Sequence, residues 1–270
     1  MNILKPIAFI FLITLFFSCS PKINQTASNP VNTLRVLSYN IHHCNPPSKE
    51  GLIDVDAIVK TIKLQNPDLV ALQEVDVNTK RSGSINEAVL LAAKLNMNVY
   101  FGKAIDHDGG DYGVAILSKY PLTEQKTFKL PKNNDPKAEQ RVFAIATVTL
   151  PGGKKIKFAS THLDAQKTEE NRVMQATEIN RLTAAEKLPL LIAGDLNADP
   201  TSKTLSIIDK QFSRSCTDCG FTIPVINPRK TIDYIAFKKE NNFKIISHQV
   251  IDERYASDHL PVLAVFELNP

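Results

Sequence analysis

The sequence lacks several features that would mark particular classes of protein. It has no run of about 20 apolar residues, the length that a membrane-spanning helix needs. From Thr33 onward it has no Gly/Ser-rich linker, low-complexity tract or long run of charge, so no internal domain boundary is marked. The net charge of +4 and the pI near 8.7 do not predict a strongly basic nucleic-acid surface. The hydrophobic fraction of 43% is nevertheless enough for a sizeable core.

Cysteine is also scarce, and its spacing supports little chemistry. Cys216 and Cys219 have the two-residue spacing of redox and zinc-binding pairs, but no second pair and no nearby histidine would complete a zinc site. The alternatives that remain for this pair are a local disulfide and two free thiols in a loop.

The N-terminal segment is not expected to belong to the fold. A basic start and an apolar run of about a dozen residues lead to Ser18-Cys19, which predicts an export signal. Cys19 resembles the lipidated cysteine of a bacterial lipoprotein; plain secretion and a retained anchor are the alternatives. We therefore expect attachment to the lipid bilayer of the bacterial cell envelope, facing the periplasm or the outer surface. The expected division is a signal peptide over residues 1–18, a polar tether over 19–32 and a folded domain over 33–270.

The apolar patterning predicts few helices and many short strands. Apolar residues recur on one face of three segments, which predicts helices over Asp54–Leu64, Ile85–Leu95 and Glu169–Ala185. The second helix would begin at a capping box formed by Ser84 and Glu87.

The chain also contains a loose internal repeat. A strand–helix–strand unit from Leu34 to Glu74 is echoed from Ile156 to Asn197, and each unit ends in polar groups. We expect two similar halves that share a cleft where the strand ends meet. Many strands with few helices predict an α+β fold in which two sheets pack face to face with helices outside.

Polar side chains terminate or precede the apolar runs at five places. Because strands this apolar should be buried, the polar groups at their ends are expected to converge on one edge of the core. Carboxylates, amides and imidazoles gathered there are the materials of a hydrolase that uses a hard metal ion. The five segments are Leu34–Asn40, Leu69–Glu74, Ile156–His162, Leu190–Asn197 and Ala256–Pro261.

Short polar motifs within and beside these segments follow a recognisable order. They are Tyr39-Asn40, Gln73-Glu74, Thr161-His162, Gly194-Asp195-Leu196-Asn197, Ile232-Asp233-Tyr234 and Ser257-Asp258-His259. From about Thr33 to Leu268 the chain thus resembles the endonuclease/exonuclease/phosphatase superfamily. The resemblance implies a four-layer α/β/β/α sandwich, with two mainly antiparallel sheets between the helices, as the catalytic domain. It also implies metal-dependent hydrolysis of phosphoesters, with Mg²⁺ as the expected ion and Mn²⁺ as the alternative.

The resemblance implies a metal site around Glu74. The family position that matches Glu74 is the principal metal ligand, and a carboxylate oxygen suits Mg²⁺. Asn40 would order the metal or its waters, and Asp258 would face the metal. Some members carry an acid where this chain has His42 and His43, which leaves open whether His42 binds a second metal, contacts substrate or only packs.

The resemblance also implies a set of catalytic residues. Asp195 would orient the attacking water and take its proton, and Asn197 would hold water or phosphoryl oxygens. Strand alternation would direct both side chains the same way. Asp233 would fix the ring of His259 and keep it cationic against the phosphate charge. His162 would stabilise or protonate the leaving oxygen.

Arginines are the candidates for binding the substrate. Arg141 opens an apolar strand and is a candidate to clamp phosphate through paired donors, and Arg81 follows Glu74 closely and is a candidate to contact substrate. The alternative for both is an ordinary surface arginine. A phosphomonoesterase should have a small cationic pocket, to which Arg81, Lys103 and Arg141 could contribute.

These observations lead to an exported, Mg²⁺-dependent phosphoesterase, expected to be a monomer, that hydrolyses a phosphomonoester or phosphodiester by in-line attack of water. The absence of a long insertion to clasp a polymer favours a small phosphoester or a lipid headgroup as the substrate. A nuclease acting on DNA or RNA is the alternative within enzymes. A non-catalytic binding lipoprotein on the same fold is the alternative outside them.

Overall fold

The computed structural model describes residue 1, residues 33–241 and residues 243–268. The predicted lipidation site Cys19 and the tether lie outside the described residues, as does the predicted signal peptide apart from Met1. No helix in the described part of the chain is both long enough and apolar enough to cross a membrane.

The described domain contains two six-stranded sheets. The first sheet has the order β11 (Phe243–Val250), β12 (Val262–Leu268), β1 (Thr33–Asn40), β2 (Leu69–Val77), β4 (Gly110–Ser118) and β3 (Asn98–His107). The second sheet has the order β5 (Leu122–Lys129), β6 (Val142–Thr149), β7 (Lys155–His162), β8 (Leu190–Asp195), β10 (Asp233–Lys238) and β9 (Phe212–Arg214). The helices are α1 (Val55–Gln65), α2 (Glu87–Leu95), α3 (Glu170–Thr183) and α4 (Lys203–Ile208), with short 3₁₀ turns η1 (His42–Cys44) and η2 (Pro151–Gly153).

Each sheet is built around one parallel pair of strands. β1 and β2 are parallel with α1 between them in the chain, and β7 and β8 are parallel with α3 between them. The other named pairs of strands are antiparallel. The internal repeat predicted from the sequence is therefore confirmed, and the second strand–helix–strand unit repeats the first at the centre of the opposite sheet.

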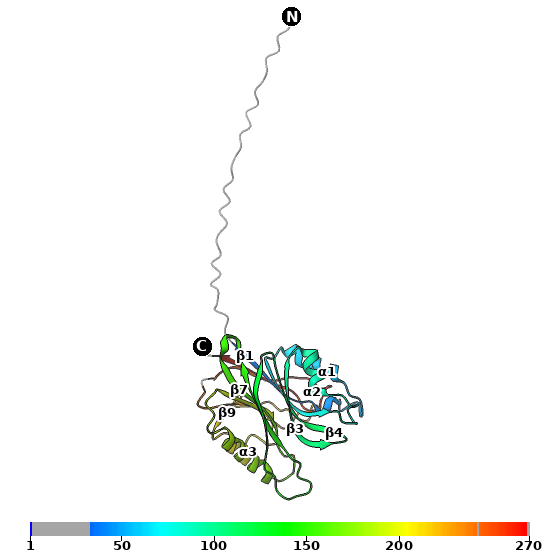
Figure 1. Ribbon diagram of the computed structural model, residues 1–270, viewed down its shortest axis with the longest axis vertical. Helices are drawn as coiled ribbons and strands as arrows, with labels where there is room; N and C mark the ends of the chain where they lie inside the picture. The colour runs from blue at the N-terminus through cyan, green and yellow to red at the C-terminus, as the bar shows by residue number, and fades with distance from the viewer. Residues whose placement is uncertain (2–32, 242, 269–270) are drawn as a thin grey trace. The chain divides into compact units, whose positions relative to one another are not determined.

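The apolar strands are buried because both faces of each sheet are covered. Leu34 and Leu69 of the first sheet pack against Phe158 and Leu191 of the second, in a core between the sheets. A second core lies under α1 and α2, and a third under α3 and α4. Figure 1 shows α1 and α2 outside the first sheet and α3 outside the second. The predicted four-layer sandwich is confirmed.

The start of α2 differs from the sequence-based prediction. Its N-cap is Asn86, whose side chain accepts a hydrogen bond from the backbone N–H of Val89, whereas Ser84 lies in a left-handed turn at φ 59°. The Glu87 carboxylate accepts a hydrogen bond from the backbone N–H of Asp76 and is buried, so it is not available for a capping box. Burial and the Asp76 charge raise the pKa of Glu87 to about 8, against the opposing hydrogen bond from the Asp76 backbone.

Candidate active site

Neighbouring strands of the second sheet bring their polar ends side by side. In the strand register His162 of β7 pairs with Asp195 of β8, and Asp195 pairs with Asp233 of β10. His259, from the segment that precedes β12, completes a group in which each residue is at least 95% buried. Oδ2 of Asp195 lies 3.4 Å from Nε2 of His162 and 3.8 Å from Nε2 of His259. We call these four residues the buried cluster.

His259 is held as a cation by Asp233. Its Nδ1 lies 2.9 Å and 3.2 Å from the two carboxylate oxygens of Asp233. Burial alone would lower the pKa of His259, but the charge and the hydrogen bond of Asp233, together with the charges of Asp195 and Asp258, raise it to about 10. The ring therefore carries a positive charge at neutral pH, and its Nε2–H faces Asp195.

His162 differs from His259 because its neighbours favour the neutral ring. Burial and the positive charges of Arg141 and His259 lower the pKa of His162 well below its usual value. Nη1 of Arg141 lies 3.3 Å from Nδ1 of His162. A guanidinium can only donate, so Nδ1 is the acceptor and Nε2 carries the proton of the neutral ring, which faces Asp195 Oδ2 at 3.4 Å. The amide nitrogen of Asn197, 3.1 Å from the same Nε2, also only donates, so that approach is a contact and not a hydrogen bond. The two imidazoles thus offer the same site one cationic and one neutral N–H donor.

Asp195 is poised to accept a proton near neutral pH. Burial and the Asp233 charge raise its pKa to about 7, although His259, the Asn197 backbone N–H and the Asn40 side chain act in the opposite direction. A carboxylate with a pKa near the working pH is well matched to general-base catalysis.

Asn197 reaches the site by a different route from the one predicted. β8 ends at Asp195, so strand alternation does not apply, and Asn197 has a left-handed backbone with φ 46°. Its backbone N–H donates to Asp195 Oδ1 at 2.8 Å, and its side-chain amide lies 3.1 Å from Nε2 of His162. The turn, rather than the strand, therefore places Asn197 beside the buried cluster.

Glu74 is likewise positioned by an irregularity and not by a strand end. β2 continues to Val77, but its register with β4 shifts between Leu72 and Val75, and Glu74 has φ 56°. Such a bulge re-aims a side chain out of the strand's alternation. The amide nitrogen of Asn40 donates to Glu74 Oε1 at 3.0 Å and to Asp195 Oδ2 at 3.2 Å. Asn40 thus links Glu74 to the buried cluster.

Glu74, His42 and His43 form a second group, the open cluster, whose members are all partly exposed. Each offers a ligand atom within 4.8 Å of the others. Nδ1 of His42 lies 2.8 Å from the backbone oxygen of Asn45, so that nitrogen is the donor and Nε2 keeps a free lone pair. Within the described part of the chain, His43 Nδ1 is buried without a hydrogen-bond partner, and burial, together with Arg81 and His42, lowers the pKa of His43 to about 4. This donor set fits a divalent metal ion.

The turn that presents the two histidines is strained. His42, His43 and Cys44 have φ values of 46°, 41° and 56°, a region that residues with a Cβ rarely adopt.

The buried cluster also has three ligand atoms within 4.8 Å, from Asp195, Asp233 and His259. A protonated His259 has no lone pair to give, however, so the open cluster is the better metal site.

The remaining predicted site residues are placed as follows. Arg81 binds both oxygens of Asp76, at 2.7 Å and 2.8 Å, and Arg141 pairs with Glu139 at 2.8 Å while contacting His162. Lys103 is exposed and pairs with two acids of its own hairpin, Asp106 and Asp111. Asp258 lies between Ser257 and His259, outside both clusters. Substrate contact by Arg81 and Arg141, and direct metal ligation by Asn40 or Asp258, stay predictions.

The sequence profile of the Endonuclease/Exonuclease/phosphatase family matches residues 37–262. The chain belongs to this family. Members of the endonuclease/exonuclease/phosphatase family are hydrolases that act on phosphoester bonds. The matched range begins in β1 and ends at the start of β12, so it contains both clusters.

Two proteins that this chain resembles carry different names. The inositol phosphosphingolipids phospholipase C of Schizosaccharomyces pombe is 28% identical over 191 residues, which are 65% of this chain and 43% of that protein. Nocturnin of Rattus norvegicus is 23% identical over 258 residues, which are 78% of this chain and 58% of that protein. The chain therefore spans about half the length of these relatives.

A solved family structure shows the same fold. The endonuclease/exonuclease/phosphatase from Beutenbergia cavernae superposes with a TM-score of 0.74 at 22% identity, covering 88% of this chain and 72% of that one. The likeness confirms the architecture, and at this identity it shows the fold alone.

Proposed function

We propose that the chain is an exported, metal-dependent phosphoesterase that hydrolyses a small phosphoester by in-line attack of water. The observation that carries this proposal is Asp195, a buried carboxyl with its pKa near 7, held between a cationic and a neutral imidazole. A proton acceptor beside two N–H donors suits a reaction in which water loses a proton while phosphoryl oxygens gain negative charge.

The side chains divide the chemistry among them. Asp195 orients the attacking water and accepts its proton. His259 directs its cationic Nε2–H, and His162 its neutral Nε2–H, toward the oxygens on which charge develops. Asp233 keeps the ring of His259 oriented and protonated, and Asn197 orients a phosphoryl oxygen or the water.

A divalent ion, Mg²⁺ or Mn²⁺, would be held at the open cluster. A bound ion of this kind would supply positive charge to the phosphoryl oxygens. Glu74 would be the oxygen ligand and His42 and His43 the nitrogen ligands, with Asn40 orienting Glu74 through their 3.0 Å hydrogen bond. Imidazole nitrogen suits Mn²⁺ and its neighbours in the transition series better than Mg²⁺.

The proposed function is tested with a panel of phosphoesters. Sugar and inositol phosphates, phospholipids, RNA and DNA are incubated with the protein in EDTA and after adding back Mg²⁺ or Mn²⁺. We expect turnover of at least one small phosphoester that EDTA abolishes, metal restores and His259→Ala removes. Activity on DNA or RNA alone would favour the nuclease alternative. If the wild-type protein and His259→Ala are equally inactive on every compound, the proposed function is wrong.

The cellular location is a separate proposal that rests on the N-terminal sequence. An apolar run ending at Ser18-Cys19 supports export and lipid attachment through Cys19. A Cys19→Ser variant should then lose incorporation of labelled fatty acid and leave the membrane fraction, while the wild-type protein remains there. Equal labelling of both proteins would contradict lipidation at this residue.

A further inference from the structure

A cavity of about 490 Å³ opens beside the active site and has no role in the chemistry described so far. Its walls come mainly from the segments that follow β7 and β8 and from the segment that precedes β10, the three strands whose ends carry His162, Asp195 and Asp233. Asn197 belongs to both places, because it lines the cavity while its side-chain amide lies 3.1 Å from His162. The volume of the cavity lies within the range of about 300–1,000 Å³ that is typical of small-molecule sites.

The cavity is lined by more cationic than acidic side chains, and three of the cationic ones are not paired with acids in the described part of the chain. Lys167, Arg229 and Lys230 line it and are exposed. Within the described residues, these three side chains make no hydrogen bond or ion pair. The guanidinium of Arg81, by contrast, is bound to a carboxylate. Asp199 is the one acid among the lining residues in the described part of the chain.

A fourth cationic residue forms part of the wall. Nη1 of Arg172 donates to the backbone oxygens of Asp164 at 2.9 Å and of Gln166 at 2.6 Å, which fixes the segment before α3. Nε of Arg172 is buried and has no hydrogen-bond partner among the residues that the structure describes. Arg172 therefore shapes the wall and adds positive charge.

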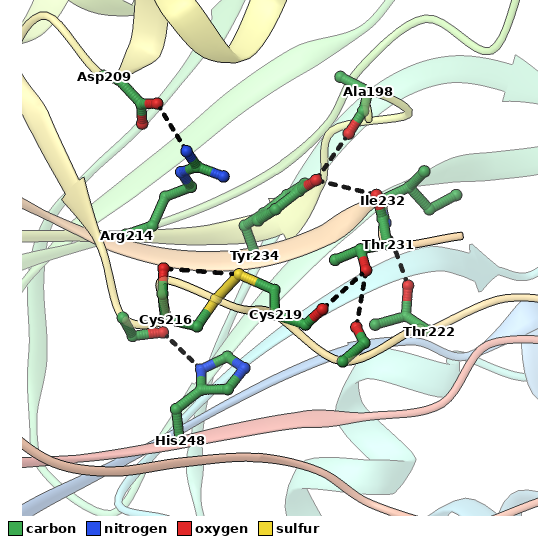
Figure 2. Close-up of a disulfide and its surroundings, with 12 residues drawn as sticks. Ala198, Asp209, Arg214, Cys216, Cys219, Thr222, Thr231, Ile232, Tyr234 and His248 are labelled. Carbon is green, nitrogen blue, oxygen red and sulfur yellow. Dashed lines mark hydrogen bonds and ion pairs between the residues drawn. A yellow bond between two sulfur atoms is a disulfide. The ribbon is translucent and has the colours of Figure 1, made fainter. Parts of the chain in front are cut away.

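The wall that presents Arg229 and Lys230 is held in place by several contacts. Figure 2 shows the disulfide between Cys216 and Cys219, so of the two alternatives left open by the sequence the local disulfide is the one present. The hydroxyl of Thr231 donates a hydrogen bond to the backbone oxygen of Cys219. The backbones of Ile223 and Lys230 bond to each other. This side of the cavity is therefore preorganised.

A single hydroxyl joins this wall to the one that contains Asn197. The Tyr234 hydroxyl lies 2.8 Å from the backbone oxygen of Ala198 and 2.9 Å from that of Thr231 (Figure 2). The backbone N–H of Leu260, next to His259, donates to the Thr222 oxygen of the same wall. A ligand in the cavity would thus be fixed relative to the buried cluster.

We propose that this cavity is a second anion-binding subsite, and that the substrate is a small molecule with a second anionic group, such as a second phosphate, besides the phosphoester that is cleaved. The proposal rests on the phosphoesterase function proposed above. Unpaired lysine and arginine side chains on a preorganised wall are the groups that bind phosphate. The limited volume favours a small molecule over a polymer.

The test compares one and two phosphates on the same carbon skeleton. The full chain hydrolyses a hexose monophosphate and the matching hexose bisphosphate in the presence of metal, and binding of inorganic pyrophosphate is measured by calorimetry without turnover. The test variant is K167A/R229A/K230A. The matched control is Lys60→Ala, an exposed lysine on α1 far from the cavity in sequence.

For the wild-type protein we expect kcat/KM to be at least tenfold higher with the bisphosphate than with the monophosphate. In the triple variant this preference should fall at least tenfold, mainly because KM for the bisphosphate rises. The affinity of the triple variant for pyrophosphate should also fall at least tenfold. Lys60→Ala should change neither. An unchanged ratio and unchanged pyrophosphate affinity in the triple variant overturn the subsite. A loss confined to oligonucleotide substrates overturns the small-molecule assignment. If the wild-type protein and His259→Ala both fail to turn over either substrate, the proposed phosphoesterase function is wrong. The subsite is then still judged by whether the triple variant loses pyrophosphate binding.

Discussion

The open and buried clusters lie next to each other, yet they differ in almost every physical respect. Residues of the buried cluster are bonded to one another and shielded from solvent, so their protonation states are set by their neighbours. Those of the open cluster are partly exposed, and within the described residues neither His42 Nε2 nor His43 Nδ1 has a hydrogen-bond partner. The first arrangement suits proton transfer and the second suits metal binding.

The two clusters also depend on different features of the chain. The buried cluster follows from regular strand register, because His162, Asp195 and Asp233 are neighbours across three strands. The open cluster follows from irregular backbone, because Glu74 lies on a bulge and His42 and His43 on a left-handed turn. Asn40 bonds directly to both Glu74 and Asp195.

The largest effect is expected from removing the proton acceptor of the buried cluster. Asp195→Asn keeps the shape of the side chain but removes its basicity, so kcat should fall by about 10²–10⁴-fold, the usual contribution of general acid–base catalysis. Steady-state kinetics on the best substrate of the panel measures this. Asp218→Asn, which changes an exposed acid in the disulfide loop, is the matched control and should retain full activity. A kcat within threefold of wild type would exclude Asp195 as the base.

This part of the site could largely be predicted from the sequence. The ends of parallel strands meet at one edge of a sheet, so apolar runs ending in Thr161-His162 and Gly194-Asp195 had to converge. The open cluster could not be predicted in the same way, because the sequence around Glu74 does not show the bulge. The cavity residues Lys167, Arg229 and Lys230 were also missed, since they lie on different loops whose meeting is a tertiary event.

A smaller effect is expected at the open cluster. Replacing His42 and His43 together by Ala should weaken the binding of the activating metal by at least the roughly 10–100-fold that is lost when only the outer partners of metal ligands are removed. Because nitrogen ligands favour Mn²⁺, the loss should be greater for Mn²⁺ than for Mg²⁺. Activation curves for the two ions measure the change. The same Mn²⁺-to-Mg²⁺ ratio in wild type and variant would show that the histidines are not ligands.

The smallest effect, counted per pH unit, is a dependence of stability on pH that comes from the buried cluster. The pKa of His259 is raised from 6.5 to about 10, so the folded state binds an additional proton between these values. This contribution to stability is complete below pH 6.5 and is lost as the pH rises through 10. One proton changes the free energy of unfolding by at most about 1.4 kcal/mol per pH unit.

Asp233→Asn should make that dependence flatter, because the carboxylate that holds the proton on His259 is removed. Urea unfolding at several pH values between 7 and 10 compares the two proteins. A slope that is equally steep in both proteins would show that the Asp233–His259 pair does not hold the additional proton.

The division of labour between the two clusters is tested most directly by metal binding without turnover. Calorimetric titration of Mn²⁺ is carried out on the wild-type protein, Glu74→Ala and Asp195→Asn at pH 7. We predict that Glu74→Ala loses at least tenfold in affinity, whereas Asp195→Asn stays within about threefold of wild type because a cationic His259 keeps metal out of the buried cluster. Loss of binding in Asp195→Asn with binding retained in Glu74→Ala would contradict the assignment and place the metal in the buried cluster.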